Sequence, residues 1–78
     1  MGCKYIIVSS VTYAMKAKSE IDSHGIKSKV EKIKNVKKLG GCGYGLKLSN
    51  DDVSVAARYL TISGIKIVDI IDCEAKSR

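Results

Sequence analysis

Apolar residues recur along the chain first with a strand pattern and then with a helical one. Residues 4–8 are rich in β-branched and aromatic side chains, which predicts a buried strand that ends before Ser9 and Ser10. Either serine can cap a following helix, because its hydroxyl accepts a hydrogen bond from an unpaired amide of the first turn. Gly25 is a suitable end for this helix. The apolar positions at helical spacing are Val11, Ala14, Met15 and Ile21.

Two further strands are expected in the middle of the chain. Residues 26–33 fit a helix as well as a strand, and the preceding glycine and the short length favour a lysine-rich edge strand. Residues 34–43 predict a basic loop that ends in glycine. Apolar and other residues then alternate over 44–48, which is the period of a strand.

A second helix and a last strand complete the pattern. Ser49 or Asn50 can cap the helix, and two aspartates follow at its positive end. Residues 65–71 are rich in isoleucine and valine and predict a strand. Residues 74–78 are charged, and we expect them to form a frayed tail.

This order of elements predicts an α+β fold of the ferredoxin-like βαββαβ type. Two helices would cover one face of a four-stranded antiparallel sheet in a two-layer sandwich. Residues 1–78 are expected to form one domain, with its core over about 4–72. We expect the first and third strands to lie parallel at the centre, the fourth beside the first, and the second beside the third.

The same arrangement makes a prediction about the three cysteines. Cys3, Cys42 and Cys73 would all lie at one end of the sheet, with Cys3 and Cys73 on neighbouring strands. Their odd number and wide spacing fit neither a secreted disulfide framework nor a Cys-x-x-Cys motif. We therefore expect free thiols, with Cys3 and Cys73 acting as small apolar residues and any disulfide between them arising by late oxidation.

The predicted strands carry more apolar surface than two helices can cover. Ile6 and Val8 point away from Tyr5 and Ile7, and the last strand is apolar on both sides as well, with Val68 and Ile70 opposite Ile67 and Ile71. Because the helices cover only one face, we expect the open face to form a homodimer or to bind a partner protein.

Size and composition limit the classes of function. With 78 residues, 45% hydrophobic, the chain suits a small folded domain without room for a deep catalytic cleft. We expect a carrier, a binding module or a subunit rather than a self-sufficient enzyme. The sequence shows neither a membrane span nor a signal-peptide pattern, so we expect a cytoplasmic location.

The candidate functional residue is Cys42, which lies in the densest run of glycine. Residues 40–45 read Gly-Gly-Cys-Gly-Tyr-Gly, so few side chains shield the sulfur. Lys37 and Lys38 stand just before this run and would favour the thiolate, the reactive form of cysteine. The backbone amides of Gly41 and Gly43 are further candidates to stabilise a sulfur anion.

The span from about residue 4 to residue 71 resembles the DUF3343 family of small bacterial proteins, which are described as selenium or sulfur carriers. The resemblance rests on a short apolar strand followed by a serine and an alanine-rich helix (10–17), and on a terminal helix and Ile/Val strand (64–67). Its most specific part is the Cys42-Gly43 pair that opens the third strand. The resemblance implies a sulfur or selenium carrier that uses Cys42 and needs neither a cofactor nor a metal. A desulfurase-like donor and an acceptor protein would be its partners.

Two alternatives stay open from the residues alone. The first is a non-catalytic binding module for RNA or protein, because the net charge is +6 and lysines cluster before the glycine run. In such a module Tyr5 and Tyr44 would stack bases on the sheet. The second is a soft-metal site made by the three thiols, although their spacing fits no standard motif. The single histidine, His24, lies far from Cys42 in sequence, so no hydrolase triad is visible.

Overall fold

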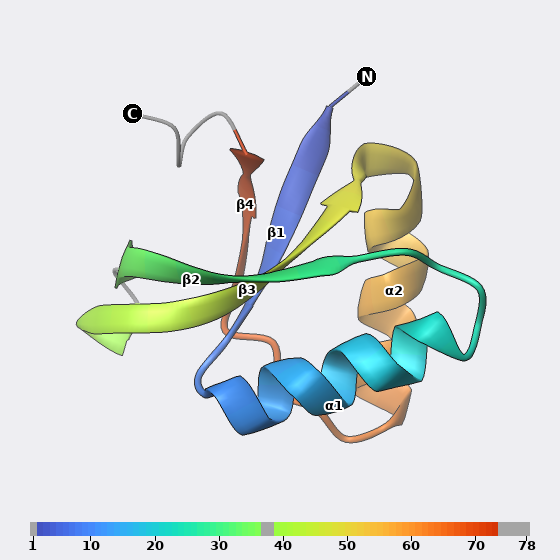
Figure 1. Ribbon diagram of the computed structural model, residues 1–78, viewed down its shortest axis with the longest axis horizontal. Coiled ribbons are helices and arrows are strands. Elements are labelled where there is room, and N and C mark those ends of the chain that lie inside the picture. The colour runs from blue at the N-terminus through green and yellow to red at the C-terminus, as the bar shows by residue number, and fades with distance from the viewer. Residues whose placement is uncertain (1, 37–38, 74–78) are drawn as a thin grey trace.

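In the described part of the chain, four strands and two helices follow one another in the predicted order βαββαβ (Figure 1). The computed structural model describes residues 2–36 and 39–73, and the predicted tail lies outside them. The fold is α+β with a ferredoxin-like layout, as predicted. The elements are β1 (Cys3–Val8), α1 (Val11–Asp22), β2 (Lys29–Val36), β3 (Gly41–Ser49), α2 (Asn50–Ile62) and β4 (Asp69–Asp72).

The sheet has the predicted strand order, β2-β3-β1-β4, but one predicted direction is wrong. β1 and β3 pair antiparallel, with Val8 opposite Tyr44 and Cys3 opposite Ser49. The connection through α1 returns the chain along the direction of β1, so β2 is parallel to β1, and the following hairpin reverses β3. The start of β3 therefore lies at the opposite end of the sheet from the start of β1.

Two strands begin later than predicted, and both shifts have the same cause. Gly25 ends α1 with a φ of 78°, and the next amide, of Ile26, donates to the Ile21 carbonyl at 3.0 Å. Gly64 ends α2 with a φ of 83°, and the Ile65 amide donates to the Leu60 carbonyl at 2.9 Å. These are Schellman caps, in which the residue after the glycine closes the helix. Each isoleucine thus belongs to a helix end, and β2 and β4 start only at Lys29 and Asp69.

The helix starts agree with the predicted caps in part. The Ser10 hydroxyl accepts a hydrogen bond from the Tyr13 amide at 3.3 Å, as expected for one of the two candidate serines. Ser49 occupies the equivalent position before α2, but its hydroxyl donates to the Asp52 carboxylate at 3.2 Å instead of capping a backbone amide.

Each face of the sheet has its own apolar core. The core between the sheet and the helices, called here the helix-side core, contains Ile6, Val8, Leu46 and Leu48 from the central strands. The second core lies on the other face and contains the buried side chains of Tyr5, Ile7, Ile33 and Val36. Leu39, Val68, Ile71 and Cys73 are partly buried and pack against the second core.

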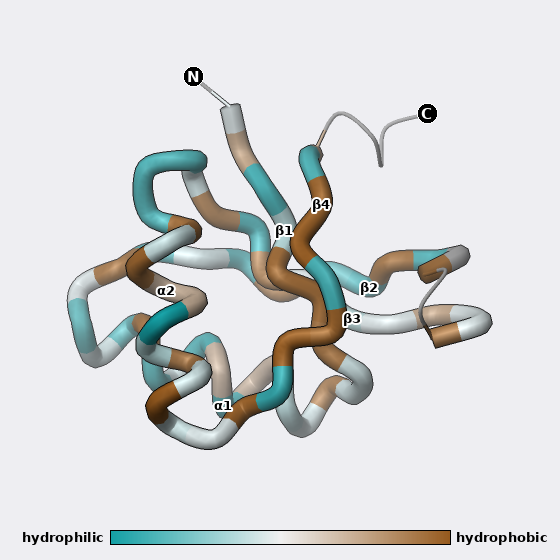
Figure 2. The backbone as a smooth tube through the Cα atoms, turned by 180° about the vertical axis from the view of Figure 1, so that it is seen from behind, coloured by the Kyte–Doolittle hydropathy of each residue, from teal (hydrophilic) through white to brown (hydrophobic). Residues whose placement is uncertain are grey.

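The second core leaves less open apolar surface on this face than expected, and a homodimer or a partner protein across it stays a prediction. Figure 1 shows the β2–β3 hairpin crossing β1 and β4 at a steep angle, so the twisted sheet folds over its own rear face. From behind, hydrophobic stretches of β1 and β4 run side by side (Figure 2). Gly45 allows this closure, because a Cβ there would come within 3.0 Å of both Ile33 and Tyr5. The apolar residues with high exposure lie elsewhere; they are Val11, Tyr13, Met15, Val55, Ile62 and Ile70.

The alternation predicted for the last strand is only partly correct. Ile67 packs against the helix-side core, and Ile71 packs against the second core, as expected for opposite faces. Val68 was expected opposite Ile71 but packs with it against the second core. It precedes β4, where its amide donates to the Ile7 carbonyl at 2.8 Å, so the backbone is not yet in regular strand register.

Among residues 2–36 and 39–73, no helix has the length and apolar character needed to cross a bilayer.

Tyr5 places one polar group at the edge of the second core. Its hydroxyl donates a hydrogen bond to the Glu31 carboxylate at 2.9 Å, while the residue as a whole is 4% exposed. Burial raises the pKa of Tyr5 above its ordinary value of 10.0, and the hydrogen bond and negative charge of Glu31 raise it further.

This contact predicts a loss of stability in alkaline solution. The folded state holds the Tyr5 proton more tightly than the unfolded chain, so the contribution is complete below about pH 10 and is lost as the pH rises through the raised pKa. We expect Tyr5→Phe to reduce the free energy of unfolding at pH 7 by about 1 kcal/mol. Urea unfolding at pH 7 to 11 measures both effects. A variant whose stability falls above pH 10 as steeply as that of the wild type would contradict this role of Tyr5.

Candidate functional site

Cys42 lies at the start of a strand and not in the predicted loop. It is the second residue of β3, its side chain is exposed, and its thiol is free. The predicted loop over 34–43 is wrong at both ends, because β2 continues to Val36 and β3 begins at Gly41. The thiol is thus mounted on a paired strand, which holds its backbone more firmly than a loop would.

A β-bulge lies directly opposite Cys42. Ile33 pairs with Gly43, and Val36 pairs with Gly41, so residues 34 and 35 of β2 face the single residue Cys42 of β3. A bulge of this kind leaves one residue unpaired and bends the strand locally, and bulges are frequent next to functional sites. The bulge therefore places Lys34 across from Cys42.

Cys42 and two lysines share one face of the hairpin. Along β3, Tyr44 and Leu46 face the helix-side core, so strand alternation turns Cys42 to the same side, past the end of β1. Lys32 pairs with Tyr44, and Lys34 is two residues further along β2, so both belong to this side as well. Both lysines are exposed. The surroundings of the thiol on this face are therefore cationic.

The glycines of the site have different roles. Gly40 turns the hairpin with a φ of 68°, which is a left-handed conformation that favours glycine. Gly41 is exposed, and a Cβ there would meet no atom within 4 Å. Gly43 is buried, and a Cβ there would lie 2.7 Å from the Leu39 side chain and 3.2 Å from the Val8 carbonyl oxygen. Gly43 is thus required by packing, whereas Gly41 leaves the sulfur accessible.

Sequence reasoning proposed Cys42 as the candidate residue but did not find Lys34, the cation that the strand register places opposite it. Lys37 and Lys38, the predicted cations, lie outside the described residues. Lys34 was assigned to a loop, because the pairing of two strands, and hence a bulge, is not visible in the alternation of a single strand. A second signal was overlooked. The motif Gly-Cys-x-Tyr occurs twice, at Gly2-Cys3 and at Gly41-Cys42.

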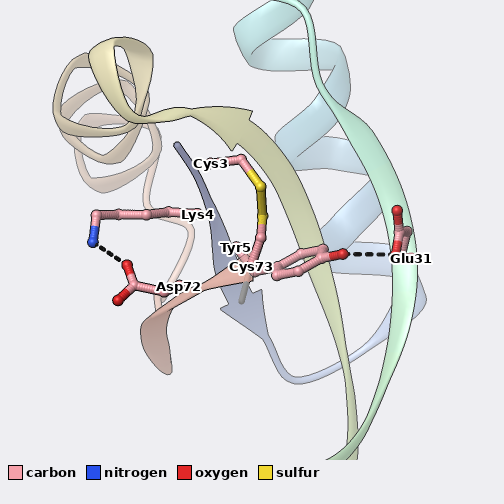
Figure 3. The surroundings of a disulfide bond; sticks show 6 residues. All are labelled: Cys3, Lys4, Tyr5, Glu31, Asp72 and Cys73. Atoms are coloured by element: carbon pink, nitrogen blue, oxygen red, sulfur yellow. Dashed lines mark hydrogen bonds and ion pairs between the residues drawn. A yellow bond between two sulfur atoms is a disulfide. The ribbon is translucent and has the colours of Figure 1, made fainter. Parts of the chain in front are cut away.

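The three thiols do not lie together. Cys3 begins β1 and Cys73 directly follows the neighbouring strand β4, so the two lie side by side as predicted, and they form a disulfide with a Cα–Cα distance of 5.5 Å (Figure 3). The expectation that both thiols are free is therefore wrong. Cys42 lies at the other end of the sheet, because β1 and β3 are antiparallel. This arrangement contradicts a metal site built from the three thiols. In the described part of the chain no group of three or more His, Cys, Asp or Glu side chains could hold a metal ion.

The two helices point opposite ends toward the side of the sheet where Cys42 lies. A negative helix end there would oppose an anionic sulfur. Only α2 ends there, whereas α1 begins there, because it follows the end of β1 at Val8. The first turn of α1 contains no acidic residue, so its positive end is not neutralised locally. Since α1 packs against both β2 and β3, the helix nearer to the hairpin has the favourable polarity.

The features expected for RNA binding are not assembled on one surface. Tyr5 is buried in the second core, so its ring is not available for stacking, and Tyr44 lies on the opposite face. Lys29 pairs with Lys47 on the side of Tyr5, whereas Lys32 and Lys34 lie on the other side. The lysines of β2 therefore divide between the two faces of this edge strand.

His24 contacts a residue of each helix. Its ring stacks on Tyr59 with the centroids 3.7 Å apart, and its Nε2 lies 3.5 Å from the Glu20 carboxylate. These contacts join the end of α1 to α2 and leave His24 without a connection to Cys42.

The packing of Gly43 predicts different effects for two neighbouring substitutions. Gly43→Ala should reduce the free energy of unfolding by about 1–3 kcal/mol, because the new methyl group would displace Leu39 and crowd the Val8 carbonyl. Gly41→Ala is the matched control and should change it by less than about 0.5 kcal/mol, because its Cβ meets open space. Thermal or urea unfolding compares the two. Equal effects of both substitutions would show that Gly43 is not a packing site.

No family model matches this chain, and neither do any curated protein or solved structure. The resemblance to the DUF3343 family therefore stays an expectation from the residues, and the site is interpreted from its own chemistry.

Proposed function

We propose that this protein is a small sulfur or selenium carrier in which Cys42 is the carrying residue. The observation that supports this proposal is the combination of an exposed, unpaired thiol with a cationic face at the tip of a hairpin. The other two cysteines are bonded to each other, so Cys42 is the thiol that remains for chemistry.

The proposed reaction is a transfer of sulfane sulfur. The Cys42 thiolate attacks the outer sulfur of a persulfide on a donor enzyme, a new S–S bond forms at Cys42, and the donor leaves as a thiolate. In delivery, an acceptor nucleophile attacks the outer sulfur of the Cys42 persulfide, and the Cys42 thiolate leaves. Each half-reaction moves one sulfur atom without net oxidation. A selenium atom could be carried in the same way.

The charge distribution around Cys42 suits this chemistry. Both the attacking thiolate and the product persulfide are anions, and the exposed cations of Lys32 and Lys34 lie on the same face of the hairpin as the sulfur. The positive end of α1 lies on the same side. The hairpin extends beyond the end of β1, as Figure 1 shows, which leaves room for a donor protein to approach.

Loading by a cysteine desulfurase tests the proposal directly. After incubation with a desulfurase and cysteine, intact-mass spectrometry should show a gain of one sulfur atom in the wild type and none in Cys42→Ser. Peptide mapping after alkylation should place the added sulfur on Cys42. The double variant Cys3→Ser/Cys73→Ser is the control and should still be loaded. Equal loading of Cys42→Ser would refute the carrier role of this residue.

The role of the opposing lysine is tested by the reaction rate of Cys42 with an anionic disulfide. Lys34→Glu should slow the reaction with 5,5′-dithiobis(2-nitrobenzoate) by roughly three- to tenfold at low salt, because a nearby cation attracts the dianionic reagent. Lys27→Glu, an equal charge change at an exposed position just before the start of β2, should have little effect. If the two variants react at the same rate, Lys34 does not influence the thiol.

A further inference from the structure

The Cys3–Cys73 disulfide joins the two ends of the described chain across adjacent strands. Lys4 pairs with Asp72 in the β1–β4 register, so Cys3 and Cys73 occupy the next opposed position. Their Cα–Cα distance of 5.5 Å lies within the usual range for a disulfide. Figure 3 shows the bond spanning the gap between β1 and β4.

The disulfide forms part of the wall of a groove. Both cysteines are half-buried, and both line a groove at the end of the sheet opposite to Cys42. The other lining residues come from the chain segment before β1, from the junction of β3 with α2 and from the end of β4; they are Gly2, Ser49, Asn50, Asp51 and Asp72. A small thiol can therefore reach the bond without unfolding of the protein.

The strand that the disulfide fastens is otherwise weakly held. β4 has four residues, lies at the edge of the sheet, and pairs only with β1. Its side chains alternate between half-buried and exposed, and none is fully buried. The ion pair between Lys4 and Asp72 is solvent-exposed, and such pairs contribute little to stability. At the start of β4, the Val68 amide bonds to the Ile7 carbonyl. At its other end the backbone pairing with β1 reaches Lys4 and Asp72, and the disulfide adds a covalent link directly after that pair.

We propose that Cys3–Cys73 is a redox latch that opens by exchange with a thiol entering the groove and so releases β4 from β1. The thiolate of the reagent attacks one sulfur, the S–S bond breaks, and the other cysteine leaves as a thiolate that takes up a proton. A second thiol then attacks the mixed disulfide. In total, two reagent thiols are oxidised to one disulfide, and Cys3 and Cys73 are reduced to two thiols.

Opening the latch changes the surface of the protein. β1 becomes an edge strand, whose backbone amides and carbonyls on that side lose their partners. Val68, Ile71 and Cys73 cover one flank of the second core, so their departure exposes the neighbouring side chains of Tyr5 and Ile7. The reduced protein therefore offers a strand edge and an apolar flank that the oxidised protein conceals.

The latch is separate from the carrier chemistry of Cys42. The two sulfur sites lie at opposite ends of the sheet, so neither can exchange with the other inside one molecule. The experiment is therefore made in the Cys42→Ser background, and its result does not depend on the carrier proposal.

The test is hydrogen–deuterium exchange of Cys42→Ser in its oxidised form and after reduction with dithiothreitol, without denaturant. Reduction should accelerate exchange of the amides in 69–72 by at least about tenfold, while the amides shared by β2 and β3 keep their protection. Removal of dithiothreitol in a glutathione redox buffer should restore the bond and the protection. Asp72→Asn, which removes the ion pair but keeps the disulfide, is the control and should exchange like the parent.

Three results would overturn the proposal. Resistance of the disulfide to dithiothreitol in the folded protein would show that the groove does not admit a thiol. Equal acceleration of exchange in all strands would show that the bond stabilises the whole domain and not β4 alone. Unchanged protection of 69–72 after complete reduction, verified by alkylation and mass spectrometry, would show that β4 does not depend on the bond.

Discussion

The burial of β1 on both faces is the constraint on which the rest of the structure depends. Ile6 and Val8 contact the helix-side core, and Tyr5 and Ile7 contact the second core, so a single central strand is shared by two apolar layers. Two short helices can cover only one face of a four-stranded sheet. The twist of the sheet solves this problem, because the β2–β3 hairpin folds across the rear face and buries Ile33 and Val36 there.

This closure explains the position of the candidate site. Folding the hairpin over the rear face requires glycine at Gly45, where Tyr5 and Ile33 approach the backbone, and at Gly43, where the Val8 carbonyl and Leu39 do so. The glycine run therefore serves the second core as well as the exposure of Cys42. The tip of the hairpin extends past β1, so the thiol reaches solvent while its strand stays paired.

The fold was largely predictable from periodicity, but the pairing of residues was not. Capping serines and alternating strands are local signals, so Ser10 and the alternation over 44–48 identified their elements correctly. The same local logic misplaced the starts of β2 and β4, because Ile26 and Ile65 resemble strand residues but complete helix caps. The bulge that opposes Lys34 to Cys42 and the disulfide depend on contacts between distant residues, which no single segment encodes. The antiparallel course of β1 and β3 follows from the order of the elements, because the connection through α1 makes β2 parallel to β1 and the hairpin then reverses β3.

The recurrence of the Gly-Cys-x-Tyr motif has a consequence for how the molecule is organised. The described chain contains two consecutive strand–helix–strand units, each with a serine before its helix and a Gly-Ile pair after it. Val8 and Leu48 both face the helix-side core. Val8 lies two positions before Ser10, whereas Leu48 lies directly before Ser49. Relative to these serines, the two units are therefore offset by one residue on the sheet. A one-residue offset turns a side chain to the opposite face. The tyrosines of the two motif copies accordingly face different cores, and the cysteines have different neighbours: Cys3 lies beside Cys73 and is bonded to it, whereas Cys42 lies across from residues 34 and 35 and keeps a free thiol.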